Sequence, residues 1–139
     1  MSGLARSHTR VMHMIVRTLR QIIGSDRDID WGNGRSRRFL LQSDGLGFAV
    51  CDTVVRAGSE SRLEYKNHLE ACYCIEGSGE LEDENGNRWQ LVPGVLYALN
   101  QHDKHVLRAK TDLRLICVFN PALTGNERHA LSGQVSSGY

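Results

Sequence analysis

Two short stretches of the sequence carry the side chains best suited to chemistry, and the first is NHLEACYC. His68 and Glu70 stand two residues apart in it. Side chains alternate between the two faces of a strand, so both would share one face with Cys72 and Cys74. Burying an unpaired imidazole or carboxylate is costly. The pattern therefore predicts a polar cavity or a bound ion on this face, with an ordinary exposed strand face as the alternative.

The second stretch is YALNQHDKH, in which Tyr97 and His105 flank a polar turn. A tyrosine on one strand and a histidine at the start of the next can lie side by side across a hairpin. Both could meet Glu70 if the two hairpins are neighbours. His102 and Asp103 fall in the turn itself, where we expect them to be solvent-exposed or structural.

The glycines around these residues resemble the motifs of the cupins, small β-barrels that usually bind a metal. Gly58, Glu70 and Gly77 keep the spacing of the first cupin motif, and Pro93-Gly94 followed by His105 matches the second. The resemblance narrows the expected fold to a double-stranded β-helix, or jelly-roll.

The usual four-ligand cupin site cannot form here, because Glu64 and Lys66 occupy the places of its paired histidines. One carboxylate, one imidazole and the phenol of Tyr97 remain. Such a mixed oxygen and nitrogen set suits iron or manganese and tolerates zinc. Three protein ligands leave positions open for water or substrate, as in catalytic sites.

The surrounding sequence indicates short strands separated by turn residues. We expect strands over 38–42, 48–57, 64–77, 80–92 with an Asn-Gly turn at 85–86, 95–100, 105–109 and 113–121. Before them, residues 14–24 are expected to form a short strand and a helical turn that ends at Gly24. Strands of this length and spacing predict an all-β sandwich or barrel, with short helical turns near the termini.

At 139 residues the chain has room for a single core. We expect a disordered N-terminal extension over 1–13, one cupin domain over 14–133 and a flexible C-terminal tail over 134–139. The C-terminal segment around TGNERH could instead fold over the barrel mouth as a lid.

Composition favours a cytoplasmic globular protein. The chain is 40% hydrophobic and 24% charged, with a net charge of +1, so nothing indicates nucleic-acid binding. No apolar run is long enough to span a membrane, and the N-terminus lacks the apolar core of a secretory signal. The cysteines at 51, 72, 74 and 117 form no CxxC pair, and we expect them to be reduced core residues.

Longer motifs make the resemblance more specific. MIVR, YKNHLEACYCIEGSGELED, PGVLYALNQHDKHVLRA and CVFNPALTGNERH run from Met14 to about Gly133. With them the chain resembles the ectoine synthase family of cupin enzymes. That resemblance implies cyclisation of N-γ-acetyl-L-2,4-diaminobutyrate to ectoine with loss of water, dependence on iron as Fe(II), and a head-to-tail homodimer. Fe(III), Mn(II) and Zn(II) remain alternatives for the metal.

The resemblance also implies which residues form the site. The metal ligands would be Glu70, Tyr97 and His105. The substrate-contacting residues would be Arg38, Thr53, Tyr65, His68, Phe119, Glu127 and His129. Among these, Arg38 would bind the substrate carboxylate. His68 or Glu127 would take a proton from the amine, and His129 would help to deliver one to the leaving oxygen.

Two positions depart from a simple pattern. Tyr65 has the opposite strand parity to His68, so it needs a bulge or loop before residue 68 in order to face the cavity. The family usually has a tryptophan four residues before the arginine that matches Arg38, and here that place is Gly34. Trp31 would either reach the same space or leave a substrate contact missing.

Three other functions fit the same fold. The protein could be a ligand-sensing or sugar-binding cupin, although the chain has no room for the usual DNA-binding domain. It could be a hydrolase or cyclase for another N-acetylated amino acid, or a structural cupin without metal. Incubation with N-γ-acetyl-diaminobutyrate and Fe(II) would separate these alternatives.

Overall fold

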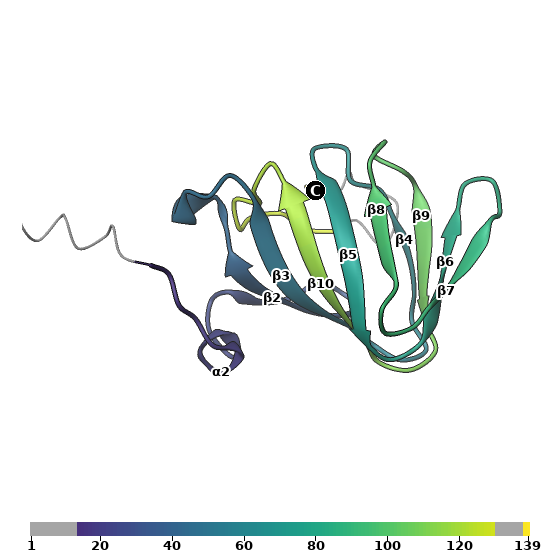
Figure 1. The fold of residues 1–139 in the computed structure, drawn as a ribbon, viewed down its shortest axis with the longest axis horizontal. Coiled ribbons are helices and arrows are strands. Elements are labelled where there is room, and N and C mark those ends of the chain that lie inside the picture. The colour runs from purple at the N-terminus through teal and green to yellow at the C-terminus, as the bar shows by residue number, and fades with distance from the viewer. Residues whose placement is uncertain (1–13, 130–137) are drawn as a thin grey trace, which may run out of the picture.

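The computed structural model describes residues 14–129 and 138–139, and its strands form two antiparallel sheets that face each other (Figure 1). The first sheet has the strand order β1 (Asp28–Asp30), β2 (Gly34–Leu40), β3 (Ala49–Val55), β10 (Leu113–Asn120), β5 (Leu69–Glu76) and β8 (Leu96–Leu99). The second sheet has the order β4 (Glu60–Leu63), β9 (His105–Ala109), β6 (Gly79–Asp83) and β7 (Arg88–Leu91). This arrangement confirms the all-β prediction.

The helical elements are short. In α2 (Leu19–Ile22) the Thr18 hydroxyl accepts a hydrogen bond from the Gln21 amide, and the Gln21 side chain accepts one from the Thr18 amide. This reciprocal capping box satisfies amides that the helix leaves unpaired. The predicted helical turn before Gly24 is therefore confirmed, but residues 14–18 form no strand. A single 3₁₀ turn, η2 (Gln42–Asp44), follows β2.

Strand bounds follow the predictions most closely in the second half of the chain. The expected strands at 95–100, 105–109 and 113–121 correspond to β8, β9 and β10. The expected strand at 80–92 is a hairpin of β6 and β7, joined at Gly86, whose φ of 82° suits glycine.

The expected strand at 64–77 was placed too early. β5 begins only at Leu69, and residues 64–68 form a loop between β4 and β5. This loop provides the break that Tyr65 needs to face the interior. The short strands β1 and β4 were missed, because neither has a run of apolar residues.

The expected hairpin between Tyr97 and His105 is wrong. β8 pairs with β5 in the first sheet, whereas β9 pairs with β4 and β6 in the second. The chain between them crosses from one sheet to the other. His102 adopts a φ of 54° in this turn, and the Asp103 side chain accepts the Gln101 amide hydrogen bond. The two rings therefore meet across the barrel rather than across a hairpin.

The core lies between the sheets, and it becomes more polar along each central strand. The inward side chains of β10 run from Leu113 and Leu115 to Cys117 and Phe119, all buried. On the neighbouring strand β5, Cys74, Cys72 and then Glu70 point the same way. One end of the barrel is thus filled by aliphatic packing, and the other end carries the polar side chains.

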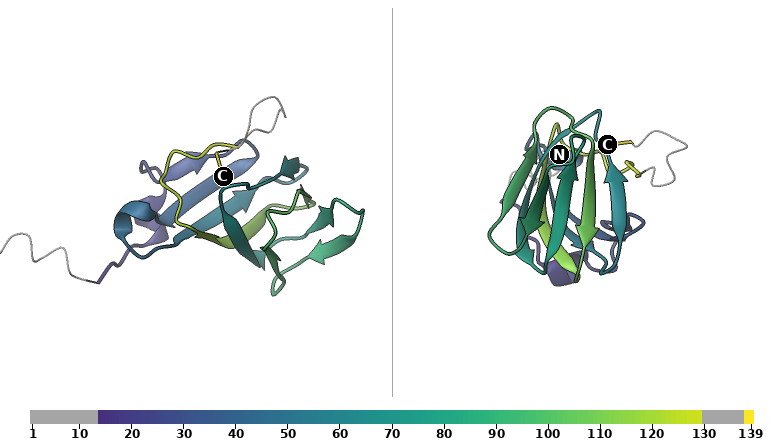
Figure 2. Two further views of the ribbon diagram at one scale, coloured as in Figure 1. Left: turned by 90° about the horizontal axis from the view of Figure 1, so that it is seen from above. Right: turned by 90° about the vertical axis from the view of Figure 1, so that its right-hand side faces the viewer.

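The predicted termini are only partly described. The extension expected over 1–13 lies outside the described residues, as do residues 130–137. Of the tail expected over 134–139, Gly138 and Tyr139 are described, and Tyr139 is buried beside the loop that precedes β5. Figure 2 shows how the segment after β10 returns across the first sheet. In the described part of the chain no helix has the length and apolar character to cross a membrane.

Candidate active site

A cavity lies at the polar end of the barrel, between the two sheets. Six of the predicted site residues line it, namely Thr53, Tyr65, Glu70, Tyr97, Phe119 and His129. Arg38, His68, His105 and Glu127 are buried directly around it and contact its lining residues or one another. The structure thus gathers all the predicted site residues into one region.

His105, the first residue of β9, presents a free nitrogen lone pair to the interior. Its Nδ1 lies 2.9 Å from the Asp103 carbonyl oxygen, which fixes the proton on Nδ1. Burial lowers the pKa of His105, so the ring is neutral. Within the described residues, its Nε2 is the one buried side-chain nitrogen or oxygen without a hydrogen-bond partner. A neutral imidazole with one nitrogen oriented and the other unpaired is the arrangement of a metal ligand.

Glu70 and Tyr97 add oxygen donors that line the cavity. Glu70 in β5 is 6% exposed, and burial raises the pKa of its carboxyl to about 8. Burial also raises the pKa of Tyr97 well above its ordinary value. The ring centroids of Tyr97 and His105 are 6.4 Å apart. A cation would favour the charged form of both oxygens and offset the cost of burying them.

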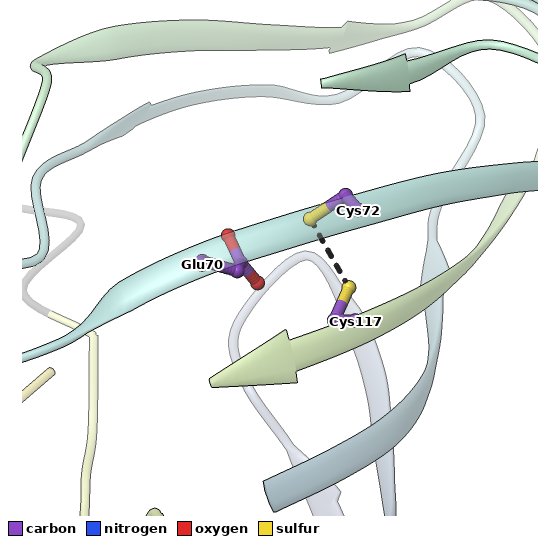
Figure 3. A group of neighbouring side chains, drawn as sticks. All are labelled: Glu70, Cys72 and Cys117. Carbon is purple, nitrogen blue, oxygen red and sulfur yellow. Dashed lines mark hydrogen bonds between the residues drawn. The ribbon is translucent and has the colours of Figure 1, made fainter. Parts of the chain in front are cut away.

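Two thiols form a second donor group with the same carboxylate. Cys72 on β5 and Cys117 on β10 are cross-strand neighbours whose sulfur atoms lie 3.3 Å apart (Figure 3). Their sulfur atoms and a Glu70 oxygen lie within 4.8 Å of one another. Burial raises the pKa of Cys72 well above its ordinary value, so the thiol stays protonated.

These donors therefore fit a metal best when His105, rather than the two thiols, is a ligand. A thiol must lose its proton to bind a metal, whereas the His105 lone pair is already available. The cysteines had been interpreted from the sequence only as core residues, although Cys72 shares a strand face with Glu70. Cys117 comes from β10, which no local pattern connects to Glu70.

Arg38 places a buried positive charge beside the cavity. Its side chain is 1% exposed, and its guanidinium donates to the carbonyl oxygens of Gly125 and Glu127 and to the Tyr139 hydroxyl. Among the described residues it forms no ion pair with a carboxylate. A buried cation that donates only to neutral oxygens is a favourable binding site for an anion.

Glu127 organises the loop that passes over Arg38. Its carboxylate accepts hydrogen bonds from the Thr124 and Gly125 amides and from the Thr124 hydroxyl. Burial alone would raise the pKa of Glu127, but these bonds outweigh it and lower the pKa. One carboxylate oxygen lies 3.9 Å from His68 Nε2. Glu127 therefore faces His68 as an ionised carboxylate.

Aromatic rings form the remaining walls. His129 lies between Trp31 and Tyr65, with ring centroids at 5.3 Å and 5.5 Å. Burial, followed by the charge of Arg38, lowers the pKa of His129 to about 3, so its ring is neutral. Phe119 packs edge-on against Tyr65 with centroids 5.8 Å apart.

Trp31 reaches the cavity from a turn that excludes any side chain at Gly34. The indole nitrogen donates to the Val54 carbonyl oxygen at 3.0 Å, and the ring lines the cavity. A Cβ on Gly34 would lie 1.8 Å from that same oxygen. The backbone thus approaches β3 too closely for a tryptophan at position 34, and Trp31 supplies an aromatic wall instead.

Comparisons with known proteins agree with this architecture. The family model described as ectoine synthase matches residues 14–137. The L-ectoine synthase of Oceanobacillus iheyensis is 52% identical over 121 residues, which cover 86% of this chain and 94% of that protein. The L-ectoine synthase of Halalkalibacterium halodurans is 49% identical with the same coverage.

Solved structures show the same relationship. The crystal structure of ectoine synthase from P. lautus superposes with a TM-score of 0.79 at 51% identity, covering 81% of each chain. An RmlC-like cupin from Shewanella frigidimarina superposes with a TM-score of 0.58 at 20% identity, covering 68% of this chain and 83% of that one. The second similarity concerns the fold alone, and it supports the predicted cupin-type barrel.

Proposed function

Because the chain belongs to the ectoine synthase family, we propose that its cavity cyclises N-γ-acetyl-L-2,4-diaminobutyrate to ectoine. The enzyme is a hydro-lyase: the substrate's α-amine attacks its own acetamide carbonyl, and the carbonyl oxygen leaves as water. Both hydrogens of the amine depart with that oxygen. The site must therefore hold one conformation and move protons from nitrogen to oxygen.

One observation carries the proposal. Two groups with unmet bonding capacity pack against the lining of a single cavity. The buried Arg38 guanidinium bonds the lining residue Tyr139 and has no described carboxylate partner, and His105, whose ring contacts the lining residue Tyr65, has a nitrogen without a described hydrogen-bond partner. The substrate has a carboxylate for the first group and an acetamide for the region of the second. Binding both ends would bend the molecule so that amine and carbonyl meet, which replaces a rare encounter by a positioned one.

We assign Glu70, Tyr97 and His105 as the ligands of the metal, with iron as Fe(II) the expected ion. The His105 lone pair, the buried Glu70 carboxyl and the half-buried Tyr97 phenol fit such an ion. When bound there, it would supply a Lewis acid that polarises the acetamide carbonyl. Tyr97 and His105 come from opposite sheets, so the barrel itself fixes the distance between them.

The other residues act on the substrate directly. Arg38 binds the carboxylate through its guanidinium fork. His68 takes a proton from the attacking amine, with ionised Glu127 beside it to stabilise the charge. His129, neutral and half-buried, passes a proton toward the leaving oxygen. Trp31, Tyr65 and Phe119 exclude bulk water around these transfers.

A second copy of the chain is the proposed partner, in the head-to-tail homodimer of the family. The outer face of the first sheet supports this assignment, since Leu69, Tyr73, Leu96 and Val118 are exposed there on neighbouring strands. We also place the enzyme in the cytoplasm, which suits the four free cysteines.

The direct test is to incubate the purified protein with the acetylated substrate and Fe(II) under low oxygen, and to follow ectoine by NMR. We expect ectoine, and its loss after chelation. Arg38→Lys should raise KM about tenfold or more, because an ammonium cannot form the bidentate contact. Arg37→Lys is the matched control, since Arg37 bonds Asp52 on the opposite face. Absence of ectoine would refute the proposed function.

A further inference from the structure

Tyr139 already occupies part of the proposed substrate site. Its side chain is 2% exposed and lines the cavity. The hydroxyl accepts a hydrogen bond of 2.7 Å from the Arg38 guanidinium, and the ring stacks on His129 with centroids 4.1 Å apart and planes 10° apart. The carbonyl oxygen lies against His68 Nδ1 and accepts the Asn67 amide at 2.9 Å.

These contacts use the groups that the substrate requires. Arg38, His68 and His129 are the proposed partners of the carboxylate, the amine and the leaving oxygen. With Tyr139 in place, the cavity leaves only about 30 Å³ for the centres of water-sized molecules. That space holds a few waters, not an acetylated amino acid. Tyr139 and the substrate cannot therefore bind together.

The surroundings of Tyr139 fit it closely. The Gly138 amide donates to the Arg128 carbonyl oxygen at 2.9 Å, and a Cβ on Gly138 would lie 3.2 Å from both the Arg128 nitrogen and the Glu127 Cα. Besides His129, the tyrosine ring packs near Tyr65 and Phe119, with centroids at 5.3 Å and 5.5 Å. Figure 1 shows this end of the chain next to β5 and β10. Arg38, which contacts Tyr139, belongs to β2, so the contact joins residues that are far apart in the sequence.

The contact between Tyr139 and Arg38 is nevertheless weaker than the contact that the substrate carboxylate would make there. Burial raises the pKa of Tyr139 to about 12, so its hydroxyl is neutral and gives Arg38 no charge partner. A carboxylate in the same place would make charge-assisted, bidentate hydrogen bonds, which are roughly twice as strong as neutral ones. Substrate can therefore displace the tyrosine.

We propose that Tyr139 competes with the substrate: its phenol occupies the place beside the Arg38 guanidinium, and the substrate carboxylate must displace it before cyclisation. The inference rests on the proposed function, because it takes this cavity as the substrate site. The apparent affinity for the substrate is then the intrinsic affinity multiplied by the fraction of molecules in which Tyr139 has left the Arg38 guanidinium. The enzyme works at full rate only once substrate is abundant.

The test compares the steady-state kinetics of Tyr139→Ala and Tyr139→Phe with the wild type. We expect Tyr139→Ala to lower KM about tenfold with kcat within about twofold, since occupancy of the open state rises. Tyr139→Phe keeps the stacking and loses the bond to Arg38, so its KM should fall by a smaller factor of about two to ten. Trp89→Ala is the control, because Trp89 is an exposed aromatic on β7 in the second sheet.

The outcomes separate the two claims. If the wild type forms no ectoine, the proposed function fails. If it forms ectoine and Tyr139→Ala lowers kcat, raises KM or changes neither, the competitor proposal is overturned. A second readout is hydrogen exchange of the Gly138 amide in the wild type, because this amide donates to the Arg128 carbonyl oxygen while Tyr139 occupies the cavity. Saturating ectoine, which needs the same guanidinium for its carboxylate, should accelerate this exchange, and unchanged exchange would contradict the proposal.

Discussion

At Glu70 the fold buries a carboxylate that the core alone does not need. Burial raises the pKa of this carboxyl to about 8, against 4.5 for an ordinary glutamate. Between these values the folded chain holds a proton that the unfolded chain has lost. The contribution of Glu70 to the stability of the metal-free protein therefore falls as pH rises through this range, and below it Glu70 imposes no penalty. A bound cation would remove the penalty by stabilising the carboxylate.

Glu70→Gln should remove the loss of stability that ionisation of Glu70 causes in the metal-free protein. The amide is uncharged at every pH, so between pH 5 and pH 8 the free energy of unfolding of the metal-free variant should rise relative to that of the metal-free wild type. The variant should also lose its metal. Urea denaturation of the chelated protein at several pH values measures this. Glu76→Gln is the control on the same strand, because Glu76 is exposed. Parallel pH dependence in wild type and Glu70→Gln would contradict the prediction.

Residue spacing was enough to select part of the site. Glu70 shares a strand face with His68, which marked it as a candidate, whereas Tyr97 and His105 were selected through a hairpin that the structure does not form. Trp31 and Tyr139 gave no such signal, since each lies in a segment without strand periodicity. Their places follow from close backbone approaches, at Gly34 and at Gly138, that only the folded chain reveals.

At the scale of elements, the existence of most strands was predictable, and strand pairing was not. The apolar runs of β8, β9 and β10 fix those strands locally. The connection between β8 and β9 has the length of a hairpin loop but changes sheet: β8 pairs with β5, and both edges of β9 are taken by β4 and β6. No local pattern records which edge is available.

The outer face of β5, β8 and β10 leads to a prediction about assembly. Tyr73 pairs across strands with Leu96 and with Ile116, so these side chains form one apolar surface. Leu96→Glu places a charge in it, which an interface between copies would have to desolvate. We expect the mass by size exclusion with light scattering to fall from dimer to monomer, with the circular dichroism spectrum unchanged.

The control for this prediction is Trp89→Glu. Trp89 is similarly exposed, at 50% against 60% for Leu96, but it lies on β7 in the other sheet. It should leave the dimer intact. A monomeric wild type, or a dimer in Leu96→Glu, would show that this face does not join the copies.

At the scale of the whole molecule, the site depends on the two sheets facing each other. Arg38 and Glu70 come from the first sheet and His105 from the second, while Trp31 and Tyr139 come from opposite ends of the described chain. Turn spacing predicted an all-β sandwich or barrel, and the cupin resemblance selected the barrel. How the chain ends fold back could not be predicted, because those contacts are long-range.

The measurement that tests the central claim most directly is bound iron per chain, together with the cyclisation rate, in His105→Gln and His102→Gln after anaerobic loading. His102 lies three residues earlier and bonds the Tyr65 carbonyl oxygen, whereas His105 keeps a buried nitrogen without a described partner. His105→Gln should lose its iron, and its rate should fall by at least about a hundredfold, since Lewis-acid stabilisation is worth several kcal/mol. His102→Gln should retain its iron. A His105→Gln protein that keeps iron and cyclises at the wild-type rate would contradict the account.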